Sequence, residues 1–255
     1  MKMLSITAIY TIWLREMKKY VRNKSRIVGN IAMPFFFLAF LGMGLNAMVT
    51  PGAFGGADYI DFLAPGIIAM TLLFSSIFTG ISVLWDREFG FLKEILVAPV
   101  SRISIVIGKV FAGMTTGALQ AFIILLFSLG LGVKITSISG VLVSVVFILL
   151  ISMAFVSLGI AFASRMRDMQ GFQMIMNFII MPIWILSGAF FPLEGTPFWL
   201  YALSRIDPLT YGVDGLRSSL VGVSGMPILL DVGVLVVFSA AMILLASWLF
   251  SKTEV

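Results

Sequence analysis

Six long apolar stretches dominate the chain, and they predict six transmembrane helices. Their bounds are 27–48, 62–84, 110–131, 138–164, 172–191 and 228–250. Each reaches the roughly 20 residues that a helix needs to cross a bilayer. A segment in lipid must satisfy its own backbone hydrogen bonds, so helices are expected. The pattern predicts an all-α integral membrane protein with one domain over residues 1–255, in which Pro34 and Pro182 kink their spans.

The first 26 residues follow a different pattern, with apolar residues at three- and four-residue spacing and basic residues mainly on the opposite face. The apolar positions are Ile6, Tyr10, Trp13, Leu14, Met17 and Val21, and the basic ones are Arg15, Lys18, Lys19 and Arg22. A signal peptide has a shorter basic region and a cleavage site, so this segment is not typical of one. It predicts an amphipathic helix within residues 1–26 that lies along the membrane interface.

Basic residues are distributed unevenly between the two sides of the predicted spans. With the N-terminus inside, fourteen of the seventeen Lys and Arg residues fall on the inner side. The remaining three are Lys134, Arg205 and Arg217. Positively charged loops stay in the cytoplasm, so both termini are expected there.

The composition of the chain argues against several classes of biochemical activity. Charged residues make up only 11% of the chain, against about 25% in soluble proteins, so lipid must contact much of the surface. There is no histidine and no cysteine, and neither the GxSxG nor the GxxxxGK[ST] motif occurs. We expect no catalytic site, no metal site, no cofactor, no nucleotide and no nucleic acid bound by this chain.

Charge is nearly absent from the predicted spans. Only Asp231 lies within them, close to one end of the last span. Ion-coupled carriers usually place ionisable residues at membrane depth, so this class is disfavoured.

Two connections are longer than the others. The inner connection, 85–109, contains a short mixed-charge helical pattern that follows Gly90 and ends at Pro99. It is either a solvated connector or an element that docks a cytoplasmic partner. The outer connection, 192–227, is partly apolar and is interrupted by three prolines. We predict short helices there that dip into the outer interface.

Small residues recur at four-residue spacing on two spans. Gly113 and Gly117 form a GxxxG pattern, and Ser76 and Gly80 repeat the spacing on the second span. Such pairs allow close helix contact, and we expect packing within the chain rather than a dimer interface.

Two blocks of sequence resemble the type-2 ABC-transporter permease family. WDREFGFLKEILVAPVSRISIVIGK at 85–109 is similar to that family's inner loop. LSGAFFPLEGTPFWLYALSRIDPLTYGVDGLR at 186–217 is similar to its outer segment. The match is closer to the daunorubicin-type drug exporters and nodulation exporters than to glycan exporters. The resemblance implies the transmembrane subunit of an exporter in a bacterial or archaeal plasma membrane.

The resemblance also implies partners and site residues. It implies two permease copies, paired through the first and fifth spans, and two copies of a separate ATPase subunit that binds ATP and Mg. The ATPase-docking residues would be Asp86, Arg87, Glu88, Phe89, Gly90, Phe91, Glu94, Pro99 and Arg102, in a coupling loop over 85–109. The outer segment would use Phe191, Pro192, Glu194, Pro208, Tyr211 and Arg217 in short re-entrant helices. A substrate path between the second and fifth spans would be lined by Met70, Phe74, Phe78, Met174, Asn177, Phe178 and Met181.

The substrate class is open between alternatives. Phe and Met suit hydrophobic or amphipathic compounds, although for each residue taken singly ordinary packing or lipid contact is the simpler explanation. Phe outnumbers Tyr and Trp by 23 to 5 and 5, which disfavours a lipid-linked glycan exporter, since a glycan path would need rings that stack on sugars. A membrane scaffold or sensor subunit that transports nothing is the other alternative.

Overall fold

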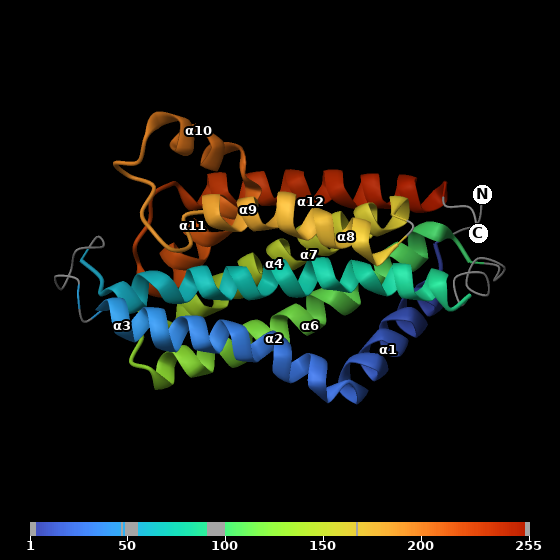
Figure 1. Ribbon diagram of the computed structural model, residues 1–255, viewed down its shortest axis with the longest axis horizontal. Helices are drawn as coiled ribbons and strands as arrows, with labels where there is room; N and C mark the ends of the chain where they lie inside the picture. Colours follow the sequence, from blue (N-terminus) through green and yellow to red (C-terminus); the bar gives the residue numbers. More distant parts are fainter. Residues whose placement is uncertain (1–3, 47, 49–55, 91–99, 167, 253–255) are drawn as a thin grey trace.

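The computed structural model describes residues 4–46, 48, 56–90, 100–166 and 168–252. Six helical spans form the bundle in Figure 1. They are α2–η1–α3 (Lys24–Phe36, Phe37–Gly42, Met43–Asn46), α4 (Tyr59–Glu88), α6 (Arg102–Gly130), α7 (Ile138–Arg165), α8–η2–α9 (Met169–Ile175, Met176–Ile180, Met181–Leu186) and α12 (Ile228–Ser251). The prediction of six spans in an all-α membrane protein is confirmed, and no strand occurs in the ranges given above.

Helix ends differ from the predicted bounds mainly around the inner connection. α4 continues to Glu88, and α6 begins at Arg102, where the hydroxyl of Ser101 accepts a hydrogen bond from the Ser104 amide. The 25-residue loop expected over 85–109 is therefore shorter than predicted. The expectation that only Asp231 lies within the spans is wrong as well, because Asp61, Asp86 and Lys109 belong to α4 and α6.

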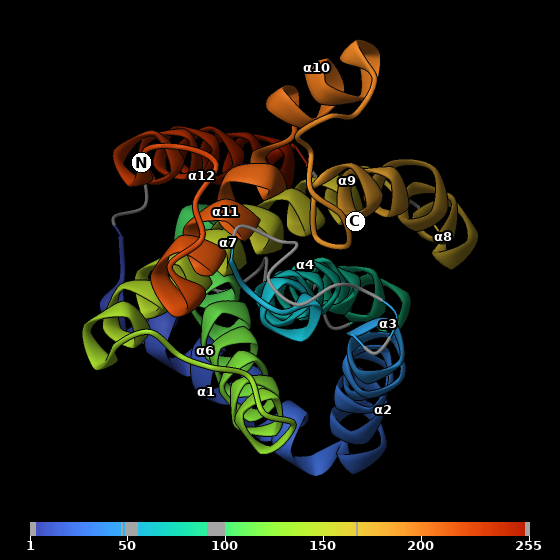
Figure 2. The ribbon, with the colours of Figure 1, turned by 90° about the vertical axis from the view of Figure 1, so that its left-hand side faces the viewer.

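The second span, α4, forms the centre of the bundle, and almost all of it is buried. Figure 2 shows α4 between α7, α6, α2 and α8. The first, fifth and sixth spans are mostly exposed, with only a small share of their residues buried. In a membrane protein such faces contact lipid or another subunit.

Close contacts between helices occur at the small residues. A Cβ atom added to Gly80 of α4 would lie 2.4 Å from the Gly159 backbone of α7. A Cβ on Gly113 of α6 would lie 2.4 Å from the Val156 side chain of α7. These glycines serve contacts within the chain, as predicted.

Both prolines expected to kink their spans adjoin a stretch of π-helix. Pro34 lies in the last turn of α2 before η1, and Pro182 is the second residue of α9, which follows η2. Proline has no amide hydrogen to donate, so the regular hydrogen-bond ladder is interrupted there, and a π-helical segment is one way to accommodate the change.

The amphipathic segment forms α1 (Ile6–Arg22), which packs against α6. The Ser5 side chain caps its first turn, and Trp13 Nε1 donates a hydrogen bond of 3.0 Å to Thr115 Oγ1 of α6. Asn23 ends α1 and caps α2, because its side-chain oxygen accepts from the Arg26 amide. One residue therefore makes the corner between α1 and the first span. That α1 lies in the membrane interface stays a prediction.

The outer connection forms two helices of different character. α10 (Phe198–Ile206) is largely exposed, whereas α11 (Pro208–Val221) is buried against α4, α7 and α12. Asp207 starts α11 by accepting a hydrogen bond from the Leu209 amide, with Pro208 in the first turn. Figure 1 shows both helices at the end of the bundle opposite α1.

Candidate functional site

The segment predicted to dock an ATPase is framed by the end of α4 and the start of α6. Glu88, Phe89 and Gly90 are exposed at the end of α4. Phe91, Glu94 and Pro99 lie outside the described residues, as does the helix expected around them. The two framing helix ends lie at the same end of the bundle as α1 (Figure 1).

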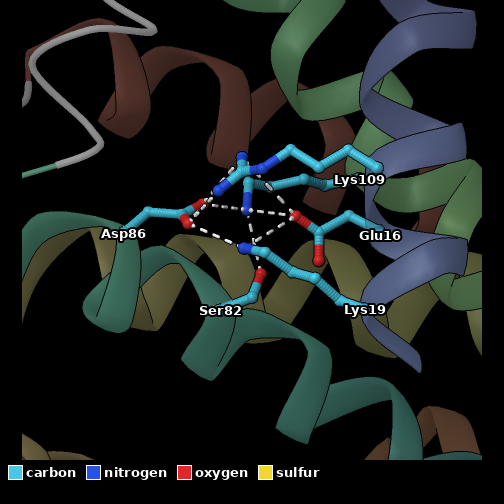
Figure 3. Close-up of polar contacts among 6 residues, drawn as sticks. Glu16, Lys19, Ser82, Asp86 and Lys109 are labelled. Carbon is cyan, nitrogen blue, oxygen red and sulfur yellow. Dashed lines mark hydrogen bonds and ion pairs between the residues drawn. The ribbon is translucent and has the colours of Figure 1, made fainter. Parts of the chain in front are cut away.

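Six polar side chains from three helices meet where α1 crosses α4 and α6, and Figure 3 shows their contacts. This inner charge cluster consists of Arg15, Glu16 and Lys19 from α1, Ser82 and Asp86 from α4, and Lys109 from α6. The Lys109 ammonium donates to Asp86 Oδ2 at 2.8 Å and to Ser82 Oγ at 2.9 Å, and Glu16 Oε1 lies 3.4 Å away. Arg15 and Lys19 bind the other Asp86 oxygen at 2.6 and 3.1 Å.

Lys109 is fully buried, with 0% of its surface exposed. The sequence interpretation placed it in a loop as one of the residues that set topology, and the structure corrects this. A buried ammonium is costly unless it is paired, and two carboxylates and a hydroxyl supply the pairing here. α6 can therefore extend through Lys109, and the lysine joins it to α4 and α1.

Asp86 is also buried, with 3% exposed, and it is the centre of the cluster. Its carboxylate contacts two basic residues of α1 and one of α6. We predicted a docking side chain on an exposed loop, whereas the structure makes Asp86 an internal tie between three helices. Arg15, Lys19 and Lys109 outnumber the carboxylates of Asp86 and Glu16, so the cluster carries a net positive charge.

Two arginines fasten the same helix ends to the rest of the bundle. Arg87 donates to the carbonyls of Met166 at 2.6 Å and Ser164 at 3.3 Å, at the end of α7. Arg102 donates to the carbonyls of Phe250 and Ser251, at the end of α12. Each guanidinium satisfies carbonyls that the helix end leaves free. Among the predicted docking residues that the structure describes, Glu88, Phe89 and Gly90 are exposed.

The predicted path residues fall into two groups that point in different directions. On α4, Met70 is buried in the core, Phe78 is partly buried, and Phe74 packs on Trp184 with ring centroids 5.6 Å apart. On the fifth span, Met174, Asn177, Phe178 and Met181 are exposed. Within one chain the structure does not bring the two groups together. The fifth-span residues buried in the bundle are instead Phe172, Met176, Ile180 and Trp184.

The outer-segment residues include a buried arginine, Arg217. Arg217 of α11 donates to the Phe62 carbonyl at 3.2 Å and the Gly188 carbonyl at 2.9 Å, and its guanidinium lies 3.7 Å from the Phe62 ring centre. Burial lowers the pKa of Arg217 to about 10. Tyr211 donates to the Arg205 carbonyl at 2.8 Å, and Pro208 opens α11. Phe191 is partly buried, whereas Pro192 and Glu194 are exposed.

Sequence reasoning missed Glu16, Ser82 and Lys109 as members of one site. A signal was present for Glu16, which is the only acidic residue among the first 26. A carboxylate within one turn of basic residues on a helix can form an ion pair with them. Nothing in the sequence positions of Ser82 or Lys109 indicated that their side chains lie near Glu16.

Together these features define a multi-pass membrane protein in which one end of the bundle is tied by internal ion pairs. The chain belongs to the ABC-2 type transporter family, whose model matches residues 7–221.

Named relatives agree with this membership. The chain is 28% identical over 244 residues to the inner membrane transport permease YadH of Escherichia coli K12, covering 93% of this chain and 92% of that protein. It is 29% identical over 214 residues to nodulation protein J of Rhizobium leguminosarum bv. trifolii, covering 83% and 80%. It is 31% identical over 161 residues to the putative transport permease ycf38 of Cyanophora paradoxa. That last match covers 63% of this chain and only 56% of the relative.

Proposed function

We propose that this chain is the permease subunit of an ATP-driven exporter that moves a hydrophobic or amphipathic compound out of the cytoplasm or the inner leaflet. A separate ATPase subunit would bind the ATP and Mg and would dock on the segment between α4 and α6. Both termini would lie in the cytoplasm.

The inner charge cluster is the observation that carries this proposal. Asp86 belongs to α4 and lies four residues before Gly90. Lys109 belongs to α6 and lies seven residues after Arg102, where α6 begins. Both are tied to α1, so a displacement of the docking segment would move three helices together. Arg87 and Arg102 pass the same displacement to the ends of α7 and α12. A partner that binds this segment differently in two nucleotide states would bias the arrangement of the spans.

A second permease copy would cover the exposed face that α2 and the fifth span share. Figure 2 shows α2 and α8 on the same side of α4. The two spans touch where Phe37 of η1 packs on Trp184 of α9, with ring centroids 5.8 Å apart. The exposed Met174, Phe178 and Met181 would then face the partner copy or the substrate. Met and Phe give large, adaptable apolar contacts, which suit amphipathic compounds.

The test is gentle purification of the chain from its native membrane, followed by mass spectrometry of what accompanies it. The expected result is a stoichiometric polypeptide with a GxxxxGK[ST] motif, whose ATPase activity rises with small amphipathic compounds. Stimulation by a lipid-linked glycan alone would favour the glycan exporter. A chain that purifies without any ATPase in every mild detergent would contradict the proposal.

A further inference from the structure

A cavity of about 810 Å³ lies beside the inner charge cluster, between α1, the start of α2 and the end of α4. Its wall includes the basic residues Arg22, Lys24 and Arg26, together with the aromatic rings of Tyr20, Trp85 and Phe89. The volume lies within the range of small-molecule sites in proteins. Five members of the inner charge cluster also line this cavity, but Arg22, Lys24 and Arg26 are not members of that cluster.

Basic side chains outnumber carboxylates on the wall of the cavity. The two carboxylates on its wall, Glu16 and Asp86, already face Arg15, Lys19 and Lys109. Within the described ranges, Arg22, Lys24 and Arg26 form no ion pair with a carboxylate. Arg26 is partly buried, and a guanidinium withdrawn from water favours an anionic partner. Arg22 and Lys24 are exposed, so all three basic residues are available to an anion that enters the cavity from outside the chain.

We propose that this cavity binds the phosphate headgroup of an acidic phospholipid of the inner leaflet. One guanidinium group can donate two parallel hydrogen bonds to two oxygens of a phosphate, and a lysine ammonium adds a point charge. Basic pockets between membrane helices on the cytoplasmic side have the chemistry that such headgroups require. The proposal concerns a ligand of the permease and holds whether or not the chain exports a compound.

A lipid fits the surroundings better than free phosphate does. Trp85 and Phe89 are exposed at the cavity, and aromatic rings are enriched at the level of lipid headgroups. α2 begins at the cavity with Lys24 and continues as an apolar span that exposes Val28 and Met33. Acyl chains could lie along that face while the phosphate occupies the basic pocket. A small inorganic anion would use none of these apolar residues.

The test measures lipid bound to the purified full-length chain by native mass spectrometry, after incubation with equal amounts of phosphatidylglycerol and phosphatidylcholine. The wild type should retain phosphatidylglycerol preferentially. The triple variant Arg22→Gln, Lys24→Gln, Arg26→Gln should lose at least about tenfold of that preference, since it removes the charges that would bind the phosphate, each worth roughly fivefold. The control triple Lys18→Gln, Arg165→Gln, Lys252→Gln removes the same charge outside the cavity, so only the general attraction of the surface for acidic lipid falls, and most of the preference should remain. Equal effects of the two triples would overturn the proposal.

A competition distinguishes the two sources of phosphate. A large excess of inorganic phosphate should leave the bound phosphatidylglycerol in place. If phosphate displaces the lipid completely and binds the chain without it, the cavity takes a free anion and the lipid proposal is wrong.

A second measurement keeps every basic residue and so does not depend on the folding of the triple variant. Nitroxide-labelled phosphatidylglycerol should quench the tryptophan fluorescence of the wild type more than phosphatidylcholine labelled at the same position. The difference should disappear in Trp85→Phe, because Trp85 lines the cavity. Equal quenching by the two lipids would contradict the proposal.

Discussion

The Lys109 ammonium and the Asp86 carboxylate lie 2.8 Å apart in the interior of the chain, and they join α6 to α4. The two helices flank the segment that we propose as the ATPase-docking site. The Lys109–Asp86 ion pair therefore holds the two ends of that segment together. Arg15 and Lys19 attach α1 to the same carboxylate.

Removal of either partner should destabilise the protein, but to different degrees. Asp86→Ala leaves Lys109 buried with only Glu16 and Ser82 nearby, and we expect a loss of about 3–5 kcal/mol. Lys109→Met should cost less, because Asp86 keeps Arg15 and Lys19 and the Met side chain fills the space. Thermal unfolding of the detergent-solubilised protein measures both, with the exposed Lys18→Ala as control. A larger loss for Lys109→Met than for Asp86→Ala would show that the carboxylate is not the centre of the cluster.

The contact between α4 and α7 should not tolerate a methyl group at Gly80. A Cβ there would lie 2.4 Å from backbone atoms of Gly159, which cannot move as a side chain can. We expect Gly80→Ala to cost at least about 1–3 kcal/mol, the usual penalty for overpacking. Gly29→Ala is the matched control, since nothing lies within 4 Å of its Cβ position in α2. Similar yields and unfolding temperatures for the two variants would argue against the close approach of α4 and α7.

The outer segment should respond to pH through Asp207. Burial raises the pKa of this carboxyl from 3.8 to about 7, although it accepts a hydrogen bond from the Leu209 amide. The folded chain therefore holds a proton that the unfolded chain has already lost. The contribution to stability is full below about pH 4 and falls as the pH rises through 7.

Asp207→Asn keeps the hydrogen-bond acceptor that caps α11 and removes the titration. The variant should show a flatter dependence of unfolding temperature on pH between 4 and 8 than the wild type. An unchanged slope would mean that Asp207 is not the titrating group.

Glu88 is the exposed acidic residue at the end of α4, and we predict that it contacts the ATPase partner. Glu88→Arg should abolish stimulation of the partner's ATPase activity while the protein still folds and inserts, because the side chain lies outside the buried core. Glu194→Arg makes the same charge change in the outer connection and should leave the stimulation intact. Full stimulation with Glu88→Arg would exclude a docking role for that side chain.

The predicted orientation can be tested with single cysteines, because the chain contains none of its own. Lys134→Cys should react with a membrane-impermeant maleimide in intact cells, since the Lys134 side chain is exposed in the connection between α6 and α7. Lys18→Cys on α1 should react only after the membrane is permeabilised. The reverse pattern would place the termini outside.

Sequence reasoning predicted the number of spans and several of their ends closely. The fourth was expected at 138–164 and forms Ile138–Arg165, and the sixth was expected at 228–250 and forms Ile228–Ser251. It failed at the third span, where α6 begins eight residues before the predicted start at 110. Hydropathy assigns Arg102 and Lys109 to a loop because it counts their charge without knowing their partners.

The candidate site was predicted only in part for the same reason. The inner connection was identified from its pattern of charged and apolar residues, and Glu88, Phe89 and Gly90 are exposed there. The sequence did not indicate that Asp86 turns inward, or that the predicted path residues of the second and fifth spans point in different directions.

The sequence by itself determined that this protein spans a membrane six times with a basic amphipathic helix at its start, because the free energy of placing apolar residues in lipid depends on composition and length. Only the tertiary structure decided which charges could be buried. The cost of burying Lys109 depends on the positions of Asp86, Glu16 and Ser82, which are 23, 93 and 27 residues away in the chain. Those positions follow from the packing of α1 against α4 and α6, and no local pattern contains them.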